Sequence, residues 1–267
     1  MKTKNFFAAV TIAFFAFSCT NDYLIDSPEM FSENSVLKSA SPHLNIAVVS
    51  DIHYMNPSLL PVDATGEAYF QEYLAQDPKL LEFSDPILQK VIADLVAKKP
   101  DIVLIPGDLT KDGEMSSHEK LAIILKQLTN KGIKVFVIPG NHDINNPYAF
   151  SFSELSPVLS IQPEDFASIY EDFGYSGSIR DANSLSYINK ISDKLWVLGI
   201  DACKYAENTI ATGPIVGGNI KPETMNWIQE NMAEARNKNV TVLTMMHHAG
   251  TNRSFYWKDL FGNRKIR

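Results

Sequence analysis

The sequence predicts an α/β domain built on a parallel β-sheet. Three short runs rich in β-branched residues each end at a turn, at residues 45–50, 101–105 and 134–138. Between them, residues 85–98 and 115–130 place apolar side chains at helical spacing. This alternation predicts a βαβαβ unit, in which the three strands run parallel and are buried.

The second half of the chain predicts another sheet. After a long loop, residues 163–173 have a helical pattern, and residues 184–189 and 194–200 have the pattern of a β-hairpin that begins this sheet. Residues 222–238 predict a helix with proline in its first turn, and residues 240–246 predict a last strand.

Residues 54–83 fit neither periodicity and directly follow the first predicted strand. A structureless loop of this length is uncommon in a compact domain unless it is functional. We therefore expect an active-site insertion or lid that contains some helix around residues 67–75.

The N-terminus has the layout of a secretory signal over residues 1–18. Lys2 and Lys4 supply the charged start, and residues 6–17 form an apolar run. This run is too short to span a membrane, for which about 20 apolar residues are needed.

Cys19 follows small residues at the end of the apolar run, which resembles the lipobox of bacterial lipoproteins, although that family usually has an aliphatic residue where Ala16 stands. The resemblance implies a lipid on Cys19 that attaches the chain to a membrane, and a location in the cell envelope, facing the periplasm or the cell surface. Residues 19–44 then form a polar tether, and residues 45–267 form the domain. An ordinary cleaved signal with a chance cysteine is the alternative.

Charge argues against a polymeric nucleic acid as partner. The chain has a formal charge of -7, which becomes -9 when the signal with its two lysines is removed. Non-specific binding to a phosphate backbone needs a basic surface, so bound cations would have to attract an anionic substrate locally. With Cys19 lipidated, Cys203 has no disulfide partner, and we expect it to be a small buried residue.

The predicted strands end in side chains that can bind metals. In parallel sheets, ligands bind at the carboxyl edge, where successive strand ends meet. Each such residue alone is common in turns, but here several strand ends carry one. They are Asp51, His53, Asp108, Asn141, His142, Asp143, His247 and His248.

These motifs, D-x-H, G-D, G-N-H-D and a later H on a strand, resemble in order those of calcineurin-like metallophosphoesterases over residues 45–250. The local strings are most similar to the bacterial branch that includes cyclic-nucleotide phosphodiesterases. The resemblance implies a four-layer α/β/β/α sandwich, with residues 184–200 in the second sheet. It also implies two divalent or trivalent metal ions, which iron, manganese or zinc could supply.

The resemblance also implies a role for each ligand. Asp51 and His53 would bind the first metal, Asp108 would bridge both metals, and Asn141 and His247 would bind the second. Two such cations can hold a hydroxide between them as the nucleophile for hydrolysis of a phosphate ester.

The same resemblance makes His142 the general acid that protonates the leaving oxygen, with Asp143 fixing its ring. His248 would face away or line the pocket, because neighbouring positions on a strand point to opposite faces, although the two histidines could be reversed. His118 is expected to be structural, on a solvated helix face, with approach to the substrate from the loop after Asp108 as the alternative. His43 lies in the tether and is also expected to be structural.

The family pattern ends in G-H-x-H, and no histidine follows His248. We therefore expect a C-terminally truncated, incomplete copy of a longer enzyme, or else a naturally short form. The preferred function is a phosphodiesterase that acts on a small phosphate ester such as a cyclic nucleotide. The alternatives are a phosphomonoesterase, a nucleotide pyrophosphatase, or a non-catalytic envelope lipoprotein that binds metal or phosphate.

Overall fold

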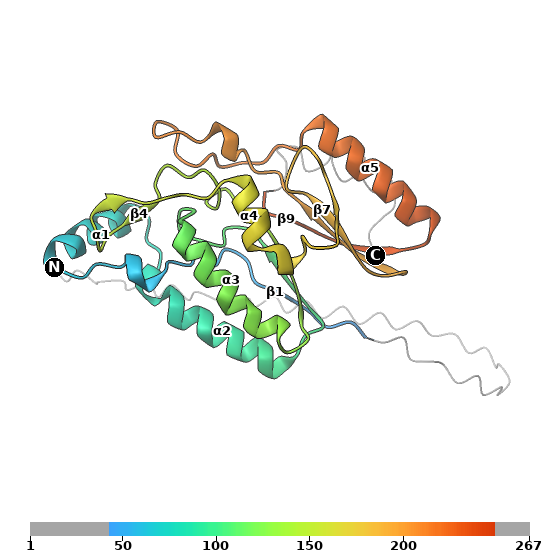
Figure 1. Ribbon diagram of the computed structural model, residues 1–267, viewed down its shortest axis with the longest axis horizontal. Helices are drawn as coiled ribbons and strands as arrows, with labels where there is room; N and C mark the ends of the chain where they lie inside the picture. Colours follow the sequence, from blue (N-terminus) through green and yellow to red (C-terminus); the bar gives the residue numbers. More distant parts are fainter. Residues whose placement is uncertain (1–42, 249–267) are drawn as a thin grey trace, which may run out of the picture. The chain divides into compact units, whose positions relative to one another are not determined.

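The computed structural model describes residues 43–248 of the 267-residue chain (Figure 1). The predicted signal peptide, Cys19 and the segment after His248 lie outside the described residues, so the predictions about them and about the domain boundaries stay predictions. Within the described part, no helix combines the length and the apolar character that a membrane span requires.

The first sheet is parallel, with strand order β1-β2-β3. Its strands are β1 (Ile46–Val48), β2 (Ile102–Pro106) and β3 (Lys134–Ile138), and α2 (Ser84–Lys98) and α3 (Met115–Thr129) connect them. The predicted βαβαβ unit is confirmed. Strands and helices alternate here because each β-branched run is followed by a helix with one apolar face, which covers the sheet.

The second sheet has the order β6-β7-β8-β9. It consists of β6 (Ile179–Arg180), β7 (Tyr187–Ser192), β8 (Leu195–Ile200) and β9 (Thr241–Met246), with α5 (Pro222–Asn237) leading into the last strand. The predicted hairpin is present as β7–β8, and β9 runs parallel to β8.

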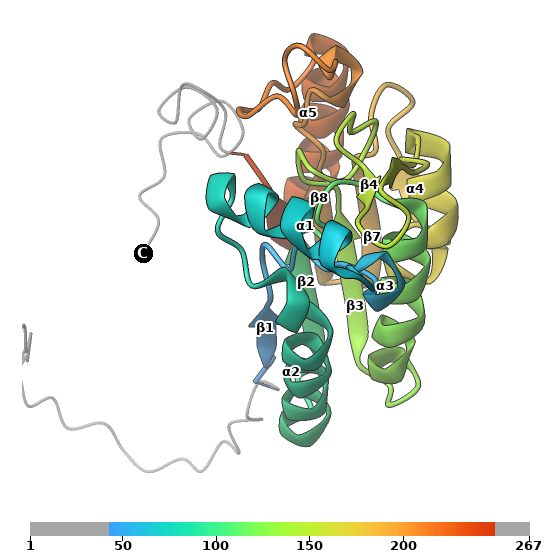
Figure 2. The same ribbon diagram turned by 90° about the vertical axis from the view of Figure 1, so that its left-hand side faces the viewer.

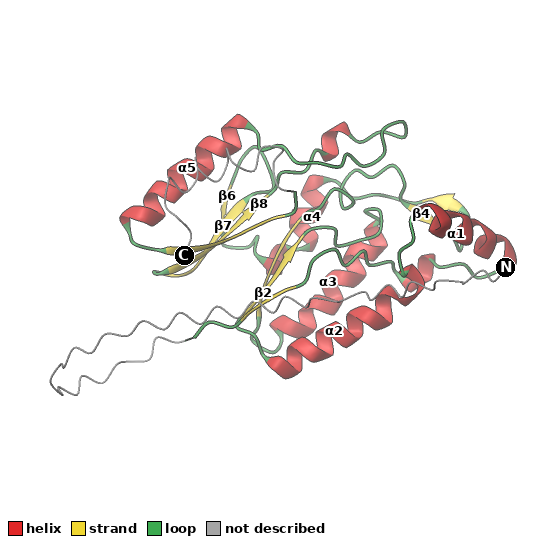
Figure 3. Cartoon of the chain, turned by 180° about the vertical axis from the view of Figure 1, so that it is seen from behind, coloured by secondary structure: helices red, strands yellow, loops and turns green. Residues whose placement is uncertain are grey.

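The two sheets face each other between the helices, which gives the predicted four-layer α/β/β/α architecture (Figures 1 and 3). Side chains alternate along a strand. Tyr187 and Val197 therefore join the core shared with the first sheet and with α2 and α3, whereas Ile188 and Trp196 pack with α5 on the other face.

Some predicted boundaries were wrong. β7 begins at Tyr187 rather than residue 184. Before it, the hydroxyl group of Ser184 donates a hydrogen bond to Asp181, and that of Ser186 accepts one from the backbone N–H of Asp201. The predicted helix over residues 163–173 is α4 (Pro163–Ile169) followed by a separate 3-10 turn.

The insertion after β1 does contain the expected helix, α1 (Ala64–Gln76), whose N-cap Asp63 accepts a hydrogen bond from the backbone N–H of Gly66. Figure 2 shows α1 and the labelled strand β4. A short hairpin of β4 (Phe150–Ser151) and β5 (Ser156–Pro157), which was not predicted, contributes Phe152 to a small core shared with the insertion.

Candidate metal centre

The chains that leave β1 and β2 run side by side beyond the sheet. The backbone N–H of Asp51 lies 3.3 Å from the carbonyl oxygen of Gly107, and that of His53 lies 3.0 Å from the carbonyl oxygen of Asp108. This pairing places the His53 ring beside the Asp108 carboxylate, with Nε2 3.6 Å from Oδ2.

The second sheet brings His247 to the same place. This residue follows β9 directly, and its Nδ1 donates a hydrogen bond to the carbonyl oxygen of Pro106, 2.9 Å away. Its Nε2 is therefore turned toward Oδ1 of Asn141 at 3.2 Å and Oδ1 of Asp108 at 3.4 Å. Residues from four strand ends thus converge, as predicted from their positions.

Two groups of potential ligands share Asp108. One contains His53, Asp108 and His142, and the other contains Asp51, Asp108 and His247, with ligand atoms within 4.8 Å of one another in each group. A carboxylate common to both groups is the arrangement that the predicted bridging role requires. The grouping differs from the prediction in two respects, because Asp51 lies with His247 rather than with His53, and because His142 stands with His53 and Asp108.

The chemistry of these residues fits metal ions. Oxygen and imidazole nitrogen atoms face one another, and the buried Nδ1 of His53 has no hydrogen-bond partner among the described residues. Burial, followed by the charge of Lys79, lowers the pKa of His53, so its ring is neutral, as a metal ligand must be.

The pKa of His247 is shifted in the opposite direction, because this ring faces the Asp108 carboxylate. Burial alone would lower its pKa, but the hydrogen bond and charge of Asp108 outweigh burial and raise it to about 9. Without metal, a proton on His247 therefore balances the carboxylate. A cation bound here would take the place of that proton.

The backbone at the site is held in an uncommon conformation. Asp51, His53 and Asp108 all have positive φ angles, of 55°, 44° and 50°. Such conformations cost of order 1–3 kcal/mol each and gather at functional sites. Gly140 has no room for a side chain, because an added Cβ would lie 2.2 Å from Oδ1 of Asp108. Glycine is needed at position 140 because the ends of β2 and β3 approach each other closely at Asp108.

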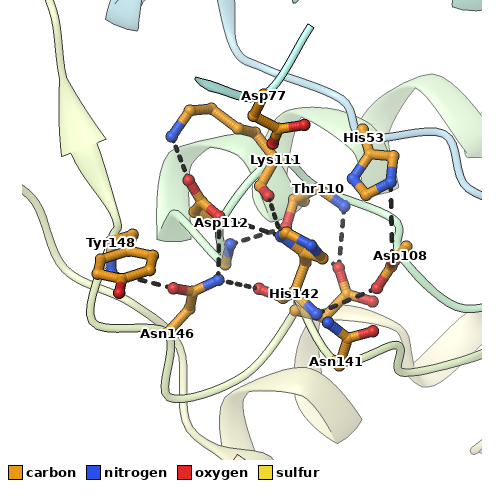
Figure 4. A network of polar contacts seen from close by, with 12 residues as sticks. His53, Asp77, Asp108, Thr110, Lys111, Asp112, Asn141, His142, Asn146 and Tyr148 are labelled. Atoms are coloured by element: carbon orange, nitrogen blue, oxygen red, sulfur yellow. Dashed lines mark hydrogen bonds and ion pairs between the residues drawn. The ribbon is translucent and has the colours of Figure 1, made fainter. Parts of the chain in front are cut away.

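His142 is oriented by Asp112 and not, as predicted, by Asp143. Its Nδ1 lies 2.8 Å from the carbonyl oxygen of Lys111 and 3.0 Å from Oδ1 of Asp112 (Figure 4). Both partners are acceptors, so Nδ1 carries the proton. Burial lowers the pKa of His142, but the hydrogen bond with Asp112 and the charge of Asp108 give a net rise.

Asp143 instead connects the loops that follow β2 and β3 by hydrogen bonds. Its buried carboxylate accepts hydrogen bonds from the backbone N–H groups of Leu109, Thr110 and Gly140, at 3.1, 2.9 and 2.7 Å. The prediction about Asp143 was wrong because the chain turns at residues 141–144. The carboxylate of Asp143 therefore faces the backbone N–H groups of the loops, while the ring of His142 points into the site.

Asp143→Ala should therefore destabilise the fold. Three buried backbone N–H groups would lose their acceptor, and we expect the free energy of unfolding to fall by about 3 kcal/mol or more. Denaturant unfolding of the purified protein measures this. Asp143→Asn keeps one acceptor oxygen and should lose less. If the free energy of unfolding of Asp143→Ala fell by less than about 1 kcal/mol, the role of Asp143 in holding these loops together would be contradicted.

The structure also tests the predictions for His248, His118 and Cys203. His248 is not the histidine against Asp108; its ring lies beside that of His247, with centroids 4.4 Å apart. His118 is fully buried rather than on a solvated face, and it bonds Tyr170 and the backbone of Asp143, which supports a structural role. Cys203 is half-buried rather than buried.

Sequence reasoning missed Asp112, Lys111 and Asn146. Asp112 accepts hydrogen bonds from His142 and from Nδ2 of Asn146 at 3.1 Å, and the fully buried Lys111 is ion-paired with it (Figure 4). The one available signal was position, because Asp112 follows Asp108 in the same strand-end loop.

The chain is similar to known proteins in its sequence. A family model described as calcineurin-like phosphoesterase matches residues 44–262. Two curated relatives are both named "Probable cyclic nucleotide phosphodiesterase". The one from Vesicomyosocius okutanii is 37% identical over 67 residues, and the one from Ruthia magnifica is 40% identical over 67 residues.

Those 67 residues are 25% of this chain and only 28% and 27% of the two relatives. Among solved structures, a dimetal phosphatase from Danio rerio is similar at 13% identity, with a TM-score of 0.48, over 78% of this chain and 70% of that chain.

Proposed function

This chain belongs to the calcineurin-like phosphoesterase family, and we propose that it hydrolyses phosphodiesters with the help of two metal ions. The observation that carries the proposal is the position of Asp108, which is shared by two groups of ligands beside His142. A single metal site would need no shared carboxylate.

Asp51, His53, Asp108, Asn141 and His247 are the residues that would hold the ions. Two ions in such a site stabilise the charge of a phosphoryl group and make water nucleophilic at neutral pH. His142 then has the task of a general acid. Asp112 and the carbonyl oxygen of Lys111 fix its ring, and its raised pKa keeps a proton available for the leaving oxygen.

A cyclic nucleotide is the substrate that we propose, since the two curated relatives carry that name. A second metal-dependent activity, on phosphomonoesters or nucleotide pyrophosphates, has no observation in its favour. Iron, manganese and zinc all suit a mixed set of oxygen and nitrogen ligands.

Comparison of two aryl phosphates tests the reaction class. We expect the metal-loaded, full-length protein to hydrolyse bis(4-nitrophenyl) phosphate with a kcat/KM at least about tenfold above that for 4-nitrophenyl phosphate, a difference of about 1.4 kcal/mol in transition-state binding. Release of 4-nitrophenolate measures both. Equal or reversed values would remove the preference for diesters.

We further propose that the protein is a lipoprotein of the cell envelope, from the arrangement of residues 1–19. The expected result is that the wild-type chain enters the detergent phase on Triton X-114 partitioning of cells, while Cys19→Ala stays in the aqueous phase. Partitioning of both proteins into detergent would contradict lipidation at Cys19.

A further inference from the structure

A groove of 670 Å³ opens beside His142, next to the candidate metal centre. Its walls come from α1, from the loop at residues 147–149 and from the β4–β5 hairpin. His142 and Asp112 form part of its lining. The groove therefore begins at the proposed general acid, where the leaving group of a phosphate ester would be.

Aromatic side chains dominate the groove. Tyr69 and Tyr148 line it with 55% and 45% of their surface exposed. Among the residues that the structure describes, neither ring packs against another aromatic ring. Figure 4 shows Tyr148 on one side of His142, with His53 and Asp108 on the other.

The three further aromatic rings of the groove, those of Tyr73, Phe150 and Phe152, already pack against one another. The ring of Tyr73 faces the ammonium group of Lys111 at 4.2 Å and packs edge-on against Phe152, with centroids 5.6 Å apart. The Tyr73 hydroxyl lies 3.2 Å from Oδ2 of Asp77 and 3.2 Å from Oδ2 of Asp112. Tyr73 thus fixes α1 against the residue that orients His142. The exposed parts of Tyr69 and Tyr148 remain open to a ligand, although Gly213 lies close to the ring of Tyr148.

The charged groups that line the groove are acidic. Glu72, Asp77 and Asp112 contribute carboxylates, of which Asp77 is ion-paired with Lys79 and Asp112 with Lys111. Among residues 43–248, no lysine or arginine lines the groove itself, so it offers neither to bind an anionic group such as a pyrophosphate. A planar ring without charge could stack on tyrosine, and amino groups on that ring could donate hydrogen bonds to the carboxylates.

We propose that this groove binds a nucleobase-like ring of the diester, by stacking on Tyr69 and Tyr148. The inference rests on the proposed function, because it assigns the phosphate to the metal centre and the ring to the groove beside His142. It adds the residues that would select the substrate, and these lie in the insertion and the hairpin.

Binding of adenosine to the metal-free, full-length protein tests the proposal independently of catalysis. We expect saturable binding of adenosine in a chemical-shift titration, and none of ribose at the same concentrations. Tyr148→Ala and Tyr69→Ala should each weaken adenosine binding about tenfold, because stacking on an aromatic side chain supplies much of the affinity for a base. Tyr148→Phe and Tyr69→Phe should bind as the wild type does, since they keep the ring.

Phe83→Ala is the matched control, because Phe83 is an exposed aromatic residue that does not line the groove. Its adenosine affinity should equal that of the wild type. Absence of saturable binding in the wild type, equal binding of ribose, or an unchanged affinity in both tyrosine-to-alanine variants would overturn the proposal. Thermal unfolding of each variant confirms that its fold is intact.

Turnover separates this inference from the proposed function. If the metal-loaded protein fails to hydrolyse any diester while adenosine still binds at the tyrosines, the reaction is wrong and the groove assignment stands. If diesters are hydrolysed but Tyr148→Ala changes the KM for cyclic AMP no more than the KM for methyl 4-nitrophenyl phosphate, which carries no nucleobase, the reaction stands and the groove assignment is overturned.

Discussion

Asp108→Ala is expected to reduce bound metal from about two ions per chain to one or none, and to reduce phosphodiester hydrolysis by at least about 10³-fold. The reason is geometric. One carboxylate oxygen lies 3.6 Å from Nε2 of His53 and the other 3.4 Å from Nε2 of His247, so a single side chain serves both groups of ligands. Its removal would weaken both metal positions together.

Metal content of the dialysed protein, measured by inductively coupled plasma mass spectrometry, gives the first readout, and hydrolysis of bis(4-nitrophenyl) phosphate gives the second. Asp172→Asn is a suitable control, because it removes an exposed carboxylate whose one ion pair within residues 43–248 is with Lys126 on the surface. That control should keep both metal and activity. Retention of two ions by Asp108→Ala would contradict the bridging role.

His142→Ala should keep the metal and lose roughly 10²- to 10⁴-fold in turnover, the range that general acid catalysis contributes. The ring is held through Nδ1 by Asp112 and the backbone of Lys111, and its raised pKa suits a proton donor. The loss should be larger for alkyl leaving groups than for 4-nitrophenolate, because an alkoxide needs a proton more than a stabilised phenolate does.

His142 also lies close enough to His53 and Asp108 to be a ligand itself. Metal analysis of His142→Ala distinguishes the two roles. Loss of an ion would assign His142 to the metal centre and end its assignment as the acid. His43→Ala replaces an exposed histidine near the start of the described chain and should change neither metal content nor rate.

Much of this site could be predicted from strand ends alone. Asp51, His53, Asp108 and Asn141 follow three parallel strands, and parallel strands deliver their carboxyl ends to one edge. The position of each residue relative to its strand is a local property of the sequence. The fold was predictable for the same reason, since the period of the apolar residues separates strands from helices.

Contacts between loops were not predictable in this way. Asp143 is adjacent to His142 in sequence, yet Asp112, 30 residues away, holds its ring. Similarly, Glu119 and Lys120 suggested a solvated helix face at His118. Each residue turns a helix by about 100°, so His118 lies on the buried face with Leu121 and Leu125.

The groove was still harder to predict, because the elements that form it leave weaker signals in the sequence. Each strand of the β4–β5 hairpin has two residues, too few for an alternating pattern to be recognised. Tyr69 and Tyr148 are 79 positions apart and come together only because α1 and this hairpin share a small core. Tertiary packing, rather than any local motif, therefore defines the proposed substrate site.

Anomalous diffraction from crystals of the manganese-loaded protein would test the shared carboxylate most directly. We expect two peaks that flank Asp108, roughly 3.5–4 Å apart, one toward His53 and one toward His247. One peak alone, or manganese bound away from Asp108, would contradict a two-metal centre at these strand ends.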